Sequence, residues 1–185
     1  MTTRDHLIAT PFAGCPPEIG RALWALQETR KRTLAILQEI KEVGAAILVD
    51  WRSPHERHSL GTLLYHLAAV EADWLYVEVL EIDFPPEMQV WFPFDMRDTD
   101  GLLTTVTKQS LGLHLQRLAA VREALLATFS AMPAADFARP RALPRYDVTP
   151  EWVVFHLTQH EAEHRTEIAS LHNRFKTEKF QTTGE

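Results

Sequence analysis

The chain has 185 residues, 45% of them hydrophobic and 24% charged, which is typical of a globular protein long enough to bury one sizeable core. Its formal net charge is −6 and its Lys and Arg residues are scattered, which argues against a nucleic-acid-binding surface. No apolar run approaches the about 20 residues that cross a membrane. Because Cys15 is the single cysteine, no intrachain disulfide can form, and a cytoplasmic location is expected.

Apolar residues recur with helical period in four long stretches. The predicted helices cover residues 17–49, a stretch that ends near residue 82, residues 102–131 and residues 149–174. The second helix begins either at the capping box Ser53-Pro54-His55-Glu56 or at Ser59. Thr149 is the expected N-cap of the fourth helix, which is followed by proline in the first turn.

Two long connections separate these helices. Residues 84–101 combine three prolines with four aromatic residues, and a loop of this kind is expected to line or cover a pocket, with Trp91 as a lining residue. Residues 132–148 are interrupted by prolines and are expected to cross one end of the molecule. The pattern predicts an all-α, up-and-down or crossed four-helix bundle, with one domain over residues 1–175 and a charged, frayed tail over residues 176–185.

The fourth predicted helix carries a stripe of histidines. His156, His160 and His164 recur every four residues and share a face with apolar residues. Burying them without partners would cost about 1–3 kcal/mol each. His156 and His164 lie roughly 12 Å apart along the axis, so at most two of the three bind one ion. A third ligand must come from another helix, where His66 is the best candidate and His114 a weaker one.

Three imidazoles would leave a coordination position open, as in catalytic zinc sites. The alternative is a metal-free protein whose core histidines are hydrogen-bonded. For His114, a position in the core or at a pocket edge is preferred over ligation. The remaining histidines are expected to be exposed: His6, His55, His58 and His172.

His160-Glu161-Ala162-Glu163-His164 also matches the H-E-x-x-H pattern of zinc peptidases. The chain lacks a strand that could hold a peptide and a suitable third ligand downstream, so proteolysis is a minor alternative. Glu161 remains a candidate general base for any reaction at the metal. The alternative is that Glu161 is an exposed acidic residue on the helix surface without a catalytic role. Three tryptophans are expected in the core: Trp24, Trp74 and Trp152.

Three segments resemble the DinB/YfiT-like family of four-helix proteins. They are Trp51 with the following turn, SLGTLLYHLAAVEADWL and FHLTQHEAEHRTEI, and the resemblance covers most of the chain. In the family the last motif commonly ends in His-Arg-Gly-Gln-Ile, whereas Thr166 and Glu167 replace the glycine and glutamine here.

The resemblance implies a divalent-metal site formed by His66, His160 and His164, with His156 as a neighbouring pocket residue. It also implies a metal-dependent enzyme that acts on a small molecule, by thiol-dependent transfer or by hydrolysis, with Glu161 or His156 moving protons. Zinc or nickel is the expected metal, with iron or manganese as alternatives. A low-molecular-weight thiol is an expected partner and a homodimer the expected assembly. The alternative function is a non-catalytic metal- or ligand-binding stress-response protein.

Overall fold

The computed structural model describes residues 7–42, 48–52 and 56–182. It is mostly helical, which confirms the predicted all-α class. The elements are α1 (Pro17–Glu42), α2 (Leu60–Asp73), a π-helix (Trp74–Val79), α3 (Pro86–Gln89), α4 (Leu111–Ser130), α5 (Ala134–Phe137), β1 (Arg141–Ala142), β2 (Asp147–Val148) and α6 (Pro150–Thr182). The two short strands pair antiparallel. No described helix combines the length and apolarity needed to cross a membrane.

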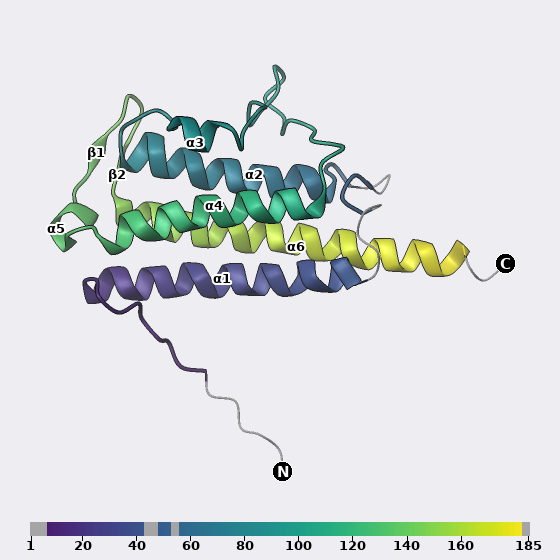
Figure 1. Cartoon of the computed structure of the whole chain (residues 1–185), viewed down its shortest axis with the longest axis horizontal. Coiled ribbons are helices and arrows are strands. Elements are labelled where there is room, and N and C mark those ends of the chain that lie inside the picture. Colours follow the sequence, from purple (N-terminus) through teal and green to yellow (C-terminus); the bar gives the residue numbers. More distant parts are fainter. Residues whose placement is uncertain (1–6, 43–47, 53–55, 183–185) are drawn as a thin grey trace, which may run out of the picture.

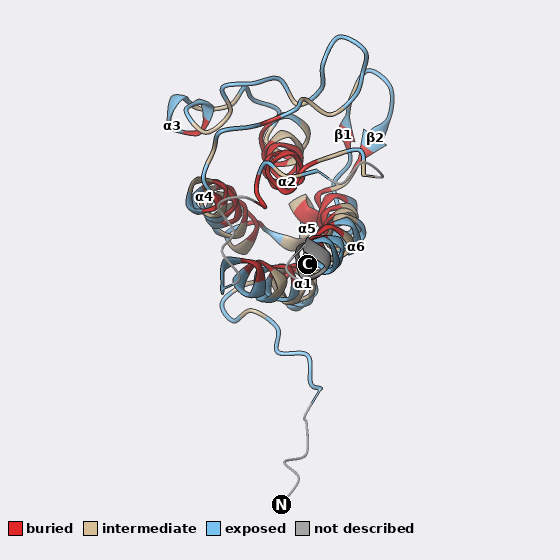
Figure 2. Ribbon diagram, turned by 90° about the vertical axis from the view of Figure 1, so that its right-hand side faces the viewer, coloured by how far each residue is buried: buried red, intermediate tan, exposed pale blue. Residues whose placement is uncertain are grey.

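The long helices α1, α2, α4 and α6 pack around a common core (Figures 1 and 2). Helix α1 contacts α4 and α6, and α2 contacts the same two helices. The sequence colours of Figure 1 show that α1 and α6 run in one direction while α2 and α4 run in the other. The order is therefore crossed, and the chain must return along the molecule between α2 and α4.

Side-chain caps start three of these helices. The hydroxyls of Ser59, Ser110 and Thr149 accept hydrogen bonds from the amides of Thr62, Leu113 and Trp152, respectively. Ser59 is thus the start of α2, and the alternative capping box at Ser53 falls partly outside the described residues.

The predicted start of the third helix at Leu102 is wrong, because α4 begins at Leu111. The intervening stretch contains four consecutive β-branched residues, Thr104 to Thr107, which favour extended backbone. Its amides are bonded elsewhere: Val106 donates to the Thr62 hydroxyl, and Lys108, at a positive φ of 59°, donates to the Asp50 carboxylate.

The ends of the first and last helices also differ from prediction. Helix α1 ends at Glu42, and Leu48 and Val49 are buried in a turn instead of a last helical turn. Helix α6 continues to Thr182, eight residues beyond the predicted end at Arg174. The reason is that His172 and Phe175 continue the buried face, with Phe175 packed edge-on against Trp51. The prediction that His172 is exposed is therefore wrong.

The second helix changes its winding after Asp73. Residues Trp74–Val79 form a π-helix, in which the Leu80 amide bonds to the carbonyl of Leu75, five residues earlier. A π-turn contains more residues than an α-turn, so it rotates the following side chains away from the earlier buried stripe. Val77, predicted to continue that stripe, is accordingly 40% exposed.

Four buried charged side chains meet at the centre of the core, one from each long helix. We call Arg30 (α1), Glu71 (α2), Arg122 (α4) and Glu161 (α6) the core ion cluster. Arg30 bonds to Glu161 at 2.7 Å and to Glu71 at 2.8 Å. Arg122 bonds to Glu71 at 2.6 Å and to Glu161 at 2.9 Å. Burial alone would raise the pKa of Glu71, but the charges and hydrogen bonds of Arg122 and Arg30 hold this pKa below its ordinary value.

The aromatic-rich loop after the π-helix is tied to the core by two side chains. The Tyr65 hydroxyl bonds to the backbone of Phe94, and the Arg117 guanidinium donates to the carbonyl of Trp91 at 2.7 Å. Arg117 also lies 3.0 Å from Nδ1 of His114, whose side chain is fully buried. Burial, and next the charge of Arg117, lowers the pKa of His114 to about 4.

The core ion cluster should contribute much more to stability than an exposed pair. Replacing Arg122 by Met leaves two buried carboxylates with one guanidinium, and we expect the free energy of unfolding to fall by about 3–5 kcal/mol in urea denaturation. The matched control is Arg32→Met, which removes an exposed i,i+4 partner of Glu28. This variant should change the free energy of unfolding by less than about 0.5 kcal/mol. Equal losses for the two variants would contradict the prediction.

His114 should make stability fall in acid. Its folded pKa of about 4 lies below the unfolded value of 6.5, so the unfolded chain takes up the proton first and stability is lost as the pH falls from 6.5 towards 4. We expect His114→Asn, which keeps an acceptor for Arg117, to remove about 2 kcal/mol of the stability loss between about pH 7.5 and pH 5. Urea denaturation at both values measures this, and unchanged pH dependence would contradict it.

Candidate metal centre

Helices α2 and α6 bring three histidines together. His66 projects from α2, and His160 and His164 lie one turn apart on α6, which runs antiparallel beside it (Figure 1). One nitrogen from each ring can be chosen such that all three lie within 4.8 Å of one another. The structure thus brings together the three residues that the family resemblance implies as metal ligands.

The spacing of these rings suits a shared ion. Nε2 of His66 and Nε2 of His160 are 3.2 Å apart. Zinc–imidazole bonds of about 2.0–2.1 Å place two nitrogens of a tetrahedral site about 3.3–3.4 Å apart, so this pair needs almost no adjustment. The ring of His164 lies 5.0 Å from that of His66 and 4.6 Å from that of His160, measured between centroids. The triad could therefore bind a divalent metal.

The surroundings keep the imidazoles in the form that binds metals. Burial, followed by the charge of neighbouring His164, lowers the pKa of both His66 and His160 to about 3. Both rings are therefore neutral near pH 7, as metal ligands must be. Nδ1 of His66 is buried and has no hydrogen-bond partner among the described residues.

The departure from the family motif places a carboxylate at the triad. Oε1 of Glu167, where the related motif commonly has glutamine, lies 3.1 Å from Nδ1 of His164 but is poorly aligned for a hydrogen bond. A carboxylate beside a ligating histidine typically orients the ring and raises its basicity. Glu167 is thus a residue of the site that spacing alone did not identify.

Glu161 lies away from the triad. The residue is only 2% exposed, so the alternative prediction that Glu161 is an exposed surface acid is wrong. One of its oxygens accepts a hydrogen bond from Arg30 and the other from Arg122. The physical reason is that adjacent helical residues point about 100° apart, so the face that presents His160 cannot also present Glu161. This geometry gives no support to Glu161 as a general base, or to a peptidase mechanism.

His114 and His58 are also separate from the three converging rings. His114 is buried beside Arg117, as the preferred core position predicts. His58, predicted to be exposed, is half-buried, and burial lowers its pKa.

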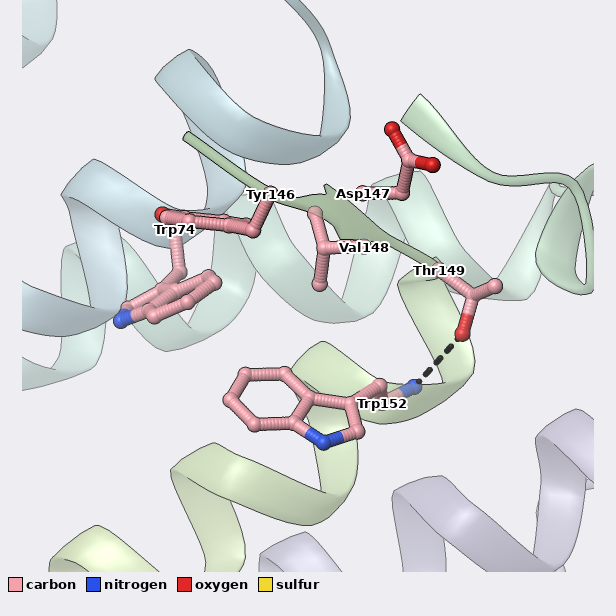
Figure 3. A pocket seen from close by; sticks show the side chains of 6 residues that line it. All are labelled: Trp74, Tyr146, Asp147, Val148, Thr149 and Trp152. Atoms are coloured by element: carbon pink, nitrogen blue, oxygen red, sulfur yellow. Dashed lines mark hydrogen bonds between the residues drawn. The ribbon is translucent and has the colours of Figure 1, made fainter. Parts of the chain in front are cut away.

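His156 adjoins the triad and connects it to a cavity. Its ring lies 5.8 Å from that of His160, stacks on Trp152 with an angle of 8° at 5.0 Å, and lies 4.8 Å from Trp74. Beyond these tryptophans is a cavity of about 550 Å³, which we call the aromatic pocket (Figure 3). It is lined by Trp74, Tyr146, Asp147, Val148, Thr149 and Trp152.

The tryptophan predictions are thus partly reversed. Trp152 is 46% exposed and lines the aromatic pocket instead of filling the core. Trp74 also lines this pocket, but it packs against the core as predicted. Trp91, predicted to line a pocket, packs against the core. Other loop aromatics, Phe84, Phe92 and Phe94, do line a second cavity of about 530 Å³. The sequence held one overlooked signal, because Trp152 continues the four-residue spacing of the histidine stripe.

Comparison with known proteins identifies the family. No curated protein matches the chain significantly. A family model described as the DinB superfamily matches residues 25–168, which include His66, His160 and His164. The match covers well over half of the sequence, and the chain therefore belongs to the DinB superfamily.

Proposed function

We propose that this protein is a divalent-metal-dependent enzyme that acts on a small molecule, through thiol-dependent transfer or through hydrolysis. The observation that carries the proposal is the convergence of three imidazoles, His66, His160 and His164, near the aromatic pocket. Three protein ligands leave room for a further ligand, which is the arrangement of catalytic metal sites. Zinc or nickel suits an all-imidazole ligand set, with iron or manganese as alternatives.

A bound divalent ion would supply Lewis acidity, which favours the deprotonated form of a thiol or water near neutral pH. The chain's own residues would hold and surround this centre. His66 is fixed on α2, and its buried ring is held between the rings of His160 and His164. Proton transfer falls to His156, which lies between the triad and the aromatic pocket, because the oxygens of Glu161 are bonded to arginines. The low-molecular-weight thiol, the homodimer and the cytoplasmic location stay predictions.

The ligand assignment predicts which substitutions abolish metal binding. We expect His66→Ala, His160→Ala and His164→Ala each to lose the bound ion in elemental analysis. Each should also lose the rise in Tm that zinc or nickel gives the unaltered protein, because an ion that binds only the folded state stabilises it. His156→Ala is the matched control, since it removes a histidine of the same stripe but should retain the metal.

Two outcomes would count against this assignment. Metal content unchanged by His160→Ala would contradict the ligand set. Absence of any bound ion, together with no stabilisation of the unaltered protein by any divalent cation, would contradict the metal dependence. For the reaction itself, turnover of an electrophilic substrate that requires both the ion and a thiol would support transfer, and turnover in water alone would support hydrolysis.

A further inference from the structure

The aromatic pocket has the size and walls of a small-molecule site. Its volume of about 550 Å³ lies within the range of about 300–1,000 Å³ of typical ligand pockets. Figure 3 shows the rings of Trp74, Tyr146 and Trp152 arranged around a common space, with Val148 at its side. The ring centroid of Trp74 lies 6.3 Å from that of Tyr146 and 5.4 Å from that of Trp152.

Most of the charges around these rings are negative. Asp147 lines the pocket, and the Tyr146 hydroxyl donates to the Glu78 carboxylate at 2.8 Å. Asp73 is near enough to act electrostatically on Tyr146. No Lys or Arg is among the lining residues. Arg145 is exposed and does not line the pocket, although its positive charge also acts on Tyr146.

An anionic ligand would find little to bind here. The start of α6 borders the pocket, but the hydroxyl of Thr149 already accepts the amide hydrogen of Trp152. Carboxylates at Asp147 and Glu151 would also repel a negative group at this end of the helix. A cationic group gains from both features, because aromatic faces and carboxylates each attract positive charge.

One side chain lies between the residues that line the pocket and the candidate metal centre. His156 contacts the two tryptophans on one side and His160 on the other. We propose that the aromatic pocket binds an organic ammonium group and so positions a cationic substrate next to the triad. The binding of the ammonium group rests on the pocket alone, whereas its assignment to a substrate rests on the proposed metal-dependent function.

The test compares three compounds of the same shape and different charge by isothermal titration calorimetry on the full chain. They are choline, its neutral isostere 3,3-dimethylbutanol and the anion 3,3-dimethylbutyrate. We expect choline to bind about tenfold or more tightly than the neutral isostere, since only the charge differs between them, and the anion to bind most weakly. No choline binding, or equal binding of choline and the isostere, would overturn the proposal.

Variants locate the binding. Trp152→Ala removes one wall and should weaken choline binding by about tenfold, and Asp147→Asn should weaken it severalfold without removing apolar surface. Phe155→Ala is the matched control, because Phe155 lies on the same helix, is 56% exposed and does not line the pocket. Equal losses in Phe155→Ala and Trp152→Ala would overturn the location. If Trp152→Ala fails to fold, Asp147→Asn, at an exposed residue, decides alone.

The metal centre is tested separately in the same titration. His66→Ala should keep choline binding within about twofold while losing the ion. Loss of choline selectivity in a protein that still binds metal would overturn the pocket proposal and leave the proposed function standing. If the unaltered protein binds choline but never binds metal, the pocket proposal stands and the proposed metal-dependent function fails.

Discussion

The core ion cluster is the interaction on which the arrangement of the other residues depends. It takes one charged side chain from each of α1, α2, α4 and α6, and each of these side chains is at most 7% exposed. Removing charges from water is expensive, and only close, multiply hydrogen-bonded geometry offsets the cost. A slip of any one helix along its axis would separate these atoms and leave a charge unpaired in the core. The cluster therefore fixes the axial position of all four helices relative to one another.

This constraint positions the candidate metal centre. Glu71 lies five residues after His66 on α2, and Glu161 directly follows His160 on α6. Since both glutamates bond to the same two arginines, the two helices that supply the histidines are held in register close to the triad. The residues of the H-E-x-x-H pattern therefore have two separate roles on one helix. Its histidines face α2, and its first glutamate belongs to the core ion cluster.

Much of this could be predicted from the sequence because it depends on local periodicity. The four-residue spacing of the histidines on the last helix and the position of His66 on a buried stripe indicated a site shared by two helices, and the family resemblance selected His160 and His164 as the pair. The start of α4 could not be predicted in this way, since an apolar stretch after Leu102 looks helical until the tertiary bonds of Val106 and Lys108 compete for it. The ion cluster was also missed, because a charged residue within a helical pattern is normally exposed. Arg30, set among Leu23, Leu26 and Leu37 at core spacing, was the available signal.

The stripe on α6 gives the aromatic pocket and the triad a fixed separation. Trp152, His156, His160 and His164 follow one another every four residues. The ring of His156 lies 5.0 Å from that of Trp152 and 5.8 Å from that of His160, so the ring at the pocket and the first ligand of the triad are two such steps apart. A single ammonium group cannot reach across this distance. A molecule that used both sites would need a chain of several bonds between its cationic group and its reacting atom, with His156 beside that chain. Under the proposed function, the rigid α6 would set a lower limit on substrate length, and cations too short to span it would occupy the pocket without reaching the triad.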